Sequence, residues 1–183
     1  MKVELIDKMG TDLSVVNAAR VSYAKEKEEF EESDERLIRY LAEHKHWSPF
    51  AHTFLSFRIK APVFVARQLV KHQVGLVWNE ESRRYITHDP EIYNIRKWRE
   101  KPDSSKQGSG EQILISTELN LEVNEHLQQG LSLYNRLLLE NVAPEQARAV
   151  LPQSMYTNWI WSGTLYAFAR VCELRLDEHS QKE

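Results

Sequence analysis

Residues 66–85 read A-R-Q-L-V-K-H-Q-V-G-L-V-W-N-E-E-S-R-R-Y and join an apolar segment to a dense polar one. Pro62, just upstream, suits the first turn of a helix because its missing N–H is not needed there and its φ is already close to the helical value. Apolar side chains then recur at helical spacing and are predicted to face a core: Val63, Ala66, Val70, Val74 and Val77. We expect this helix to end near Gly75, which loosens the backbone.

Polar side chains gather beside this apolar face. Gln68, Lys71 and His72 lie on or near another side of the predicted helix. Further donors and acceptors follow within six residues: Asn79, Glu80, Ser82, Arg83 and Arg84. An arginine fork or a lysine charge suits phosphate or a pair of carbonyls, and a serine with backbone N–H groups can complete an oxyanion cradle. The chemistry fits an anionic ligand such as a nucleotide about as well as it fits a solvated helix end.

The composition predicts one globular domain spanning residues 1–183. Of the 183 residues, 42% are hydrophobic and 28% are charged, which is enough for a substantial core. The net charge is −3, so any site for an anion must be local. The single cysteine, Cys172, excludes an internal disulfide and a cysteine-based zinc site. We find neither a membrane-length apolar run nor a signal peptide, and we therefore expect a cytoplasmic protein without a membrane partner.

The N-terminal half predicts strands alternating with helices. Residues 1–7 and 54–60 alternate between apolar and polar side chains, which is typical of half-buried strands. Thr11 or Asp12 can cap one helix, and Ser33 can begin a second one. Residues 44–52, between that helix and the second strand, form a turn-rich connection.

The C-terminal half is predicted to be mainly helical. Residues 86–110 contain prolines and glycines and read as a long surface excursion, partly mobile at 104–110. Helices are expected over about 111–141, from Pro144 to Pro152, and over about 156–176. The last of these would place apolar side chains at core spacing: Trp161, Leu165, Phe168 and Cys172. The fold class is therefore α+β, mostly helical with a small antiparallel sheet.

Residues 72–85 resemble the signature of the flavin-dependent thymidylate synthases, which is Arg-His-Arg, a short spacer, then Asn-Glu-x-Ser-x-Arg-Tyr. His72 matches the central histidine, and the second half is matched by Asn79, Glu80, Ser82, Arg84 and Tyr85. Further segments resemble family motifs in the expected order, at 18–22, 46–52, 147–152 and 174–181. The family usually continues with a C-terminal helical extension, which we expect this chain to lack.

The chain departs from this family pattern at several positions. Lys71 and Gln73 stand where the family usually has arginines, and the spacer before Ser82 is one residue longer. Lys71 keeps the positive charge, whereas Gln73 loses it, so a phosphate contact there must weaken or move. Three flavin positions also differ, because the family usually has Asn, Arg and Asn at the places of Thr164, Tyr166 and Arg170.

The resemblance implies an enzyme that methylates dUMP to dTMP with 5,10-methylenetetrahydrofolate, NADPH and FAD. It also implies a homotetramer with active sites shared between subunits. Arg175 would be the catalytic residue that activates dUMP. The implied dUMP-binding residues are Gln68, Leu69, Val70, Lys71, Glu80, Glu81, Ser82, Arg83, Arg84, Arg148 and Arg175. The implied residues for FAD or folate are Ser22, His46, Ser48, Lys71, His72, Gln73, Glu80, Thr164, Tyr166 and Arg170.

Several single residues invite other roles. Cys172 could suggest a nucleophile, but it lies on the apolar stripe of the last predicted helix and reads as a buried, inert thiol. Ser82 has no evident general base nearby, which favours a hydrogen-bonding role. Three histidines at 44, 46 and 52 lack an evident fourth ligand, so we expect no metal site.

Two rival functions remain open from the sequence. The basic and aromatic run at 83–101 is typical of nucleic-acid-binding modules, although interspersed acids and the global charge argue against it, and we expect no nucleic-acid partner. The departures from the family pattern would also suit a nucleotide-binding relative without catalytic activity. A flavin spectrum separates the enzyme from the first rival, and turnover separates it from the second.

Overall fold

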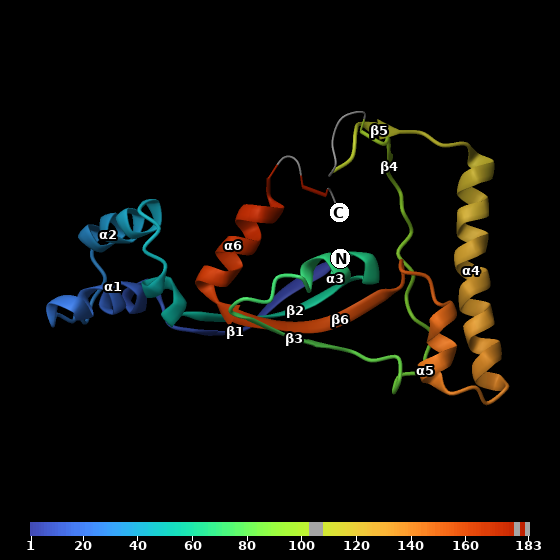
Figure 1. Ribbon diagram of the computed structural model, residues 1–183, viewed down its shortest axis with the longest axis horizontal. Helices are drawn as coiled ribbons and strands as arrows, with labels where there is room; N and C mark the ends of the chain where they lie inside the picture. Colours follow the sequence, from blue (N-terminus) through green and yellow to red (C-terminus); the bar gives the residue numbers. More distant parts are fainter. Residues whose placement is uncertain (103–107, 178–179, 182–183) are drawn as a thin grey trace.

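The computed structural model describes residues 1–102, 108–177 and 180–181. Helices and strands alternate in the first half of the chain, and helices predominate in the second half (Figure 1). In chain order they are β1 (Lys2–Met9), α1 (Asp12–Arg20), η1 (Val21–Tyr23), α2 (Glu32–Glu43), η2 (Ser48–His52), β2 (Phe54–Pro62), α3 (Val63–Leu69), β3 (Leu76–Glu80), β4 (Trp98–Arg99), β5 (Gln112–Ile113), α4 (Thr117–Leu139), α5 (Pro144–Ala147), η3 (Arg148–Val150), β6 (Tyr156–Thr164) and α6 (Leu165–Arg175).

The centre of the fold is an antiparallel sheet with the strand order β1-β2-β6-β3. Strand β6 pairs with β2 along its whole length, from Tyr156 opposite Pro62 to Thr164 opposite Phe54. Its other edge pairs with β3, and Trp161 lies opposite Trp78 there. The predicted α+β class with a small antiparallel sheet is confirmed. Its strands come from three distant parts of the chain.

One face of this sheet carries the main hydrophobic core. Helices α3 and α6 lie over this face in Figure 1. Sheet residues and helix residues share one buried cluster, which consists of Ile59, Ala61, Val65, Ala66, Trp159, Trp161 and Val171. Trp78 stacks on Trp159 with ring centroids 4.3 Å apart, and Phe168 meets Trp161 edge-on at 5.2 Å. These aromatic contacts fix how α6 sits on the sheet.

The prediction of one long final helix over 156–176 is wrong. Residues 156–164 form strand β6, and only Leu165–Arg175 are helical. Burial alternates strictly along β6, with Thr157, Trp159, Trp161 and Gly163 buried and their neighbours half-buried. A period of two, together with the β-branched and aromatic residues, overrides the helical spacing of Trp161 and Phe168.

The helix after Pro62 is also shorter than predicted. It ends at Leu69, and the chain enters β3 at Leu76. Ala66 is buried as expected, but Val74 and Val77 are 92% and 66% exposed and do not face the core. Gly75 has φ +76°, which turns the chain from the end of α3 into the edge strand.

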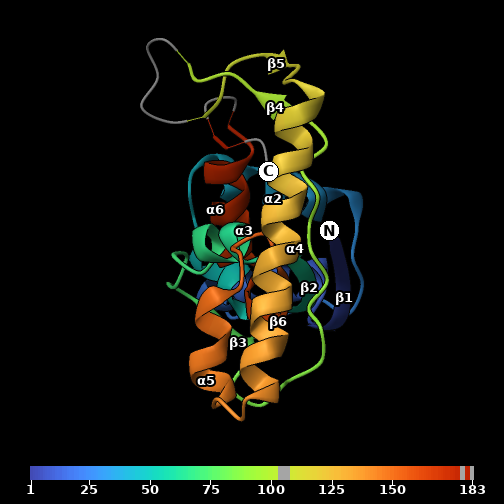
Figure 2. The same ribbon diagram turned by 90° about the vertical axis from the view of Figure 1, so that its right-hand side faces the viewer.

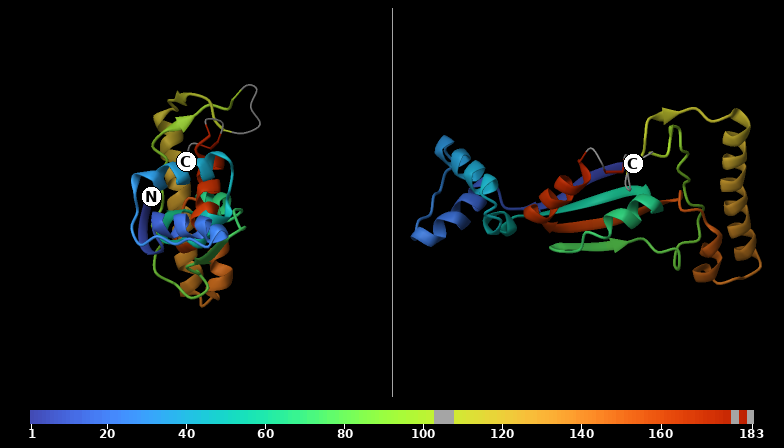
Figure 3. Two further views of the ribbon diagram at one scale, coloured as in Figure 1. Left: turned by 90° about the vertical axis from the view of Figure 1, so that its left-hand side faces the viewer. Right: turned by 45° about the horizontal axis from the view of Figure 1, so that its top comes forward.

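Two helical units flank the sheet at opposite ends of an elongated molecule (Figures 1 and 3). Helices α1 and α2 lie at one end and begin close to the predicted positions. Helix α4 stands beside α5 at the other end (Figure 2). It begins at Thr117, later than predicted, because residues 112–113 pair with β4 instead.

The predicted surface excursion over 86–110 is confirmed where the structure describes it. The Tyr134 hydroxyl on α4 donates a hydrogen bond to the Ile86 carbonyl at 3.3 Å, which ties the start of the excursion to the long helix. The predicted mobility at 104–110 falls mostly on residues outside the described part of the chain.

A buried carboxylate joins α1 to α2. Asp34 is fully buried and accepts hydrogen bonds from Arg20 at 2.8 Å, from Lys27 at 2.6 Å and from the backbone N–H of Glu31 at 3.0 Å. The hydrogen bond from Lys27 is the main cause that lowers the pKa of Asp34 from 3.8 to about 2. Because the folded-state pKa is depressed, the stabilisation is complete above pH 3.8 and is lost as the pH falls towards 2.

We predict that Asp34→Asn lowers the urea midpoint of unfolding at pH 7, because the partly buried Arg20 then loses its anion and Lys27 keeps only Glu31. The deficit relative to wild type should shrink between pH 3.8 and 2, where the wild-type carboxylate becomes protonated. Glu35→Gln is the matched control, because its pair with Arg39 is exposed and the change should stay within about 0.5 kcal/mol. A pH-independent deficit in Asp34→Asn would contradict this account.

Candidate functional site

An open pocket of about 560 Å³ lies where the turn after α3 meets the start of α6. Its walls include residues that the family resemblance assigns to FAD, namely Lys71, His72, Gln73, Thr164, Tyr166 and Arg170. Lys71 and Arg170 supply positive charge, and no carboxylate lines this pocket among the described residues. Val171 and Leu174 add an apolar wall. Residues nearly a hundred positions apart are therefore brought into one cavity.

The pocket depends on a close approach between two glycines. Gly75 accepts a hydrogen bond through its carbonyl from the Thr164 N–H at 3.2 Å. A Cβ atom on Gly163 would lie 2.2 Å from that same carbonyl oxygen, so no larger residue fits there without moving β3. The Thr164 hydroxyl caps α6 by accepting from the Ala167 N–H at 3.1 Å. This packing fixes the floor of the pocket.

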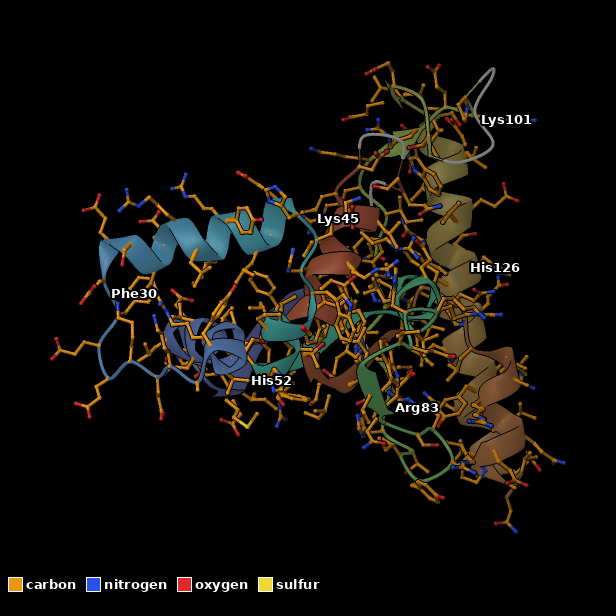
Figure 4. All side chains as sticks on the ribbon, turned by 60° about the vertical axis from the view of Figure 1, so that its left-hand side comes forward. Phe30, Lys45, His52, Arg83, Lys101 and His126 are labelled. Carbon is orange, nitrogen blue, oxygen red and sulfur yellow. The ribbon has the colours of Figure 1, made fainter. Side chains whose placement is uncertain are left out.

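Two aromatic rings separate this pocket from a smaller apolar one. The rings of Trp47 and Tyr166 lie with centroids 5.6 Å apart, and both residues line both cavities. The smaller pocket, of about 180 Å³, contains His46, and Lys45 beside α6 is labelled in Figure 4. Trp47 is 54% exposed, so one face of its ring is available to a planar ligand. Ser48, at the start of η2, is also exposed but does not line either pocket.

Arg175 lies at the end of α6 and reaches back to the turn after α3. Its Nε donates to His72 Nε2 at 2.8 Å, one terminal nitrogen donates to the Gln68 carbonyl at 3.2 Å, and the other donates to Gln181 Oε1 at 3.0 Å. Burial, and secondarily the positive charge of Arg175, lower the pKa of His72. The imidazole is therefore neutral at pH 7, and its Nε2 acts as an acceptor. Arg175 has further N–H donors beyond these contacts.

The carboxylates of the motif are held by strand β6. Glu80 accepts from the Thr157 hydroxyl at 2.7 Å and from the Trp78 indole at 3.2 Å. Glu81 accepts from the Asn158 amide at 2.8 Å. These bonds fasten the far end of β3 to the start of β6, about 13 Å along the strand from Leu76.

Ser82, Arg83 and Arg84 follow β3 beyond that far end, whereas the predicted dUMP residues Leu69 and Val70 lie where α3 ends. Arg83 is buried and donates to the His88 carbonyl, so its guanidinium ties down a loop, and Figure 4 labels it there. Ser82 accepts from the Arg84 Nε at 3.2 Å, and Arg84 stacks on the ring of Tyr85. Arg148 is exposed and donates to the Glu145 carbonyl at 3.2 Å. One copy of the chain therefore does not bring these residues to the large pocket.

Sequence reasoning missed several residues that build the site. Trp47 lies between two predicted residues, His46 and Ser48, and its position in that motif was the available signal. Gly163 and Leu76 could not be found because the pairing of β3 with β6 was not predicted. Ser22 was predicted for FAD, but it lies exposed on η1, outside both pockets.

The structure corrects one expectation about a reactive group. The prediction that Cys172 is a buried thiol is wrong, because this residue is exposed on α6. In the part of the chain that the structure describes, no His, Cys, Asp and Glu side chains cluster as a metal site would require. Over the same residues, no helix has the length and hydropathy needed to span a bilayer.

The fold and the pocket define a class of protein, namely an α+β binding protein for an anionic ligand with a planar ring. Comparison with known proteins narrows this class. Residues 4–183 match the family model described as thymidylate synthase complementing protein. The flavin-dependent thymidylate synthase of Kosmotoga olearia is 40% identical over 185 residues, which cover 99% of this chain and 79% of the relative. The chain belongs to the thymidylate synthase complementing protein family.

Other relatives agree in sequence and in structure. The flavin-dependent thymidylate synthase of Thermosipho melanesiensis is 38% identical over 184 residues, with 99% of this chain and 79% of the relative covered. The crystal structure of the UMP/dUMP methylase PolB from Streptomyces cacaoi, bound with 5-Br dUMP, superposes with a TM-score of 0.77 and 33% identity. The superposition covers 95% of this chain and 77% of PolB.

A substitution can test whether Gln73, which stands where the resemblance implies an arginine, contacts FAD. Gln73→Arg should tighten FAD binding about tenfold or more, because a charge-assisted hydrogen bond is worth about 1.5–3 kcal/mol. Fluorescence titration of the apoprotein with FAD measures the dissociation constant. Gln128→Arg adds the same charge on the exposed face of α4 and should leave the affinity unchanged. Equal affinities for wild type and Gln73→Arg would remove position 73 from the flavin contacts.

Proposed function

We propose that this chain is a flavin-dependent thymidylate synthase, which converts dUMP to dTMP. 5,10-methylenetetrahydrofolate supplies the methylene group, NADPH supplies the reducing equivalents, and tetrahydrofolate and NADP⁺ are released. FAD, when bound, supplies the hydride that completes the methyl group. The observation that carries the proposal is the contact of Arg175 with His72 and Gln68 at the edge of the large pocket. It joins a residue predicted to activate dUMP to residues predicted to bind dUMP and flavin.

The pocket fits a flavin on three counts. Lys71 and Arg170 can neutralise phosphate charge, and the rings of exposed Trp47 and half-buried Tyr166 can stack on a planar ring system. The volume of about 560 Å³ lies within the range of pockets that bind cofactors. His72 and Gln73 would then face the same ligand from the turn after α3.

Arg175 can activate the uracil ring without a covalent nucleophile. Methylene transfer requires electron density at C5 of the ring, and loss of the N3 proton increases it. A guanidinium stays charged and can bond an imide nitrogen together with its neighbouring carbonyl. The bonds to Gln68 and His72 hold the guanidinium in place, and its remaining N–H groups can face the substrate. The uracil anion is then stabilised where its charge develops.

The proposal includes a homotetramer with shared active sites. The two halves of the motif lie at opposite ends of β3 in one chain, about 13 Å apart along the strand. A second copy that places its Ser82 and Arg84 beside the large pocket would unite them. The sheet face opposite α3 and α6 is not covered by any described helix (Figure 3) and carries half-buried Ile160 and exposed Val77, which a second copy could cover. Such sharing would bring Ser82 and Arg84 to the phosphate of dUMP.

Arg175→Ala should lower single-turnover formation of dTMP at saturating dUMP by about 10²–10³, the scale of one lost electrostatic stabiliser. Arg175→Lys should not restore the rate, because a point charge cannot reproduce the fork. The visible absorption spectrum should show FAD still bound in both variants. Arg36→Ala, at an exposed position of α2, is the matched control and should keep the wild-type rate. A rate within a few-fold of wild type for Arg175→Ala would exclude Arg175 from the mechanism, and absence of FAD binding in the wild type would refute the function.

Shared sites can be tested by mixing two inactive variants. Lys71→Glu reverses the charge in the large pocket, and Arg84→Glu reverses it beyond the other end of β3. Each homo-oligomer should have little activity, whereas co-expressed mixtures should recover a substantial fraction of wild-type turnover in sites that receive neither change. Mixtures no more active than the separate variants, or sedimentation showing only monomers with FAD present, would contradict the shared site.

A further inference from the structure

A second basic and aromatic pocket lies beside the short sheet of β4 and β5. It is separate from the large pocket proposed for FAD, which we call the flavin pocket. We name the second pocket the β4 pocket. Its volume is about 550 Å³, and it is lined by Phe64, Tyr93, Ile95, Arg96, Lys97, Trp98, Arg99, Gly108, Ser109 and Gln181. It shares no lining residue with the flavin pocket. Apart from Gln181, its lining residues lie outside the segments that resemble family motifs, and the proposed reaction does not account for the pocket.

The charge of the β4 pocket is strongly one-sided. Among the residues that the structure describes, three cations and no carboxylate line it, in a chain whose net charge is −3. Arg99 is oriented by its Nε, which donates to the Ser109 hydroxyl at 2.7 Å. Arg96 and Lys97 are exposed and form no ion pair with a described carboxylate. Such a concentration of unpaired cations in a concave site attracts anions locally.

The aromatic walls of the β4 pocket are held in place. The Trp98 indole donates to the Asn120 side chain at 2.9 Å, which anchors the ring to α4. Tyr93 donates through its backbone N–H to the Ser154 carbonyl at 2.8 Å, and its ring lies 5.9 Å from that of Phe64. Rigid rings beside cations are the combination that binds a base and its phosphates together.

We propose that the β4 pocket binds a nucleoside polyphosphate. The volume holds one nucleotide, the rings can stack on the base, and the three cations suit a chain of phosphates better than a single one. A nucleic acid would need a basic surface that continues past the pocket. In the sequence, Glu91 precedes the basic run and Glu100 interrupts it before Lys101, so acidic residues dilute its charge.

A hydrogen bond connects the β4 pocket to Arg175. Gln181 lines the pocket, and its side-chain oxygen accepts from Arg175 at 3.0 Å. Arg175 in turn donates to His72, which lines the flavin pocket. A phosphate oxygen can accept a hydrogen bond from the Gln181 amide nitrogen, and the resulting shift of this side chain would release one constraint on the guanidinium. Occupancy of the β4 pocket therefore alters turnover of dUMP, a consequence that rests on the proposed function.

Binding is tested by calorimetric titration of the protein with ATP in the presence of saturating FAD and dUMP, so that those sites are filled. We expect ATP to bind more tightly than either tripolyphosphate or adenosine. The variant Arg96→Glu/Lys97→Glu should weaken ATP at least about tenfold, because it removes charge-assisted bonds. The matched control is Lys25→Glu/Arg36→Glu, which changes two exposed cations at the other end of the molecule and should bind ATP normally.

The outcomes separate this proposal from the proposed function. No ATP binding, equal binding by the two double variants, or tighter binding of an oligothymidylate than of ATP would overturn the β4 pocket as a nucleotide site, while FAD binding and turnover would still support the synthase. Loss of FAD binding in the wild type would instead overturn the synthase and leave the calorimetric test intact. Finally, ATP should change the rate of dTMP formation in the wild type and not in Arg96→Glu/Lys97→Glu. If ATP leaves the rate of dTMP formation by the wild type unchanged, the link through Gln181 is overturned.

Discussion

The pairing of β6 with both of its neighbours is the constraint on which the rest of the structure depends. One edge of β6 pairs with β2, which leads directly into α3. The other edge pairs with β3, which leads into the second half of the motif. Its buried tryptophans, Trp159 and Trp161, form the surface on which α6 rests. Since β6 runs directly into α6 at Thr164, the same strand sets the positions of Tyr166, Arg170 and Arg175. The packing of β6 therefore determines both the hydrophobic core and the position of the candidate site.

The strength of this constraint is clearest at Gly163. Its hydrogen atom faces the Gly75 carbonyl, where a Cβ would lie 2.2 Å away. This contact brings the turn after α3 against the start of α6, and the pocket lies between them. Gly75 itself needs φ +76°, which other residues adopt only at a cost. Two small residues therefore permit the approach that places Lys71 and Gln73 beside Tyr166 and Arg170.

The sequence predicted α1, α2 and α4 from local signals, and β1 and β2 from their period of two, but it missed β3 and β6. Thr11, one of the two predicted caps, precedes α1, and α2 begins next to the predicted Ser33, whereas α4 begins later than the predicted residue 111. Residues 156–164 were misread because Trp161 and Phe168 also fit a helical spacing. Their strand pairing depends on β2 and β3, which lie more than seventy residues away. The motif predicted which residue types bind a nucleotide, but it carried no information on which end of β3 each would occupy.

The departures from the family pattern acquire a physical meaning once the pocket is known. The resemblance implies arginines at positions 71, 73 and 166, and this chain has Lys71, Gln73 and Tyr166 there. Arg170, where the resemblance implies asparagine, lines the same cavity as all three. Arg170 thus adds one positive charge to the pocket, from a position one helical turn after Tyr166 on α6. Tyr166 meanwhile contacts Trp47 between this pocket and the smaller one. Compared with the pattern that the resemblance implies, these four positions carry one cation fewer and one aromatic ring more.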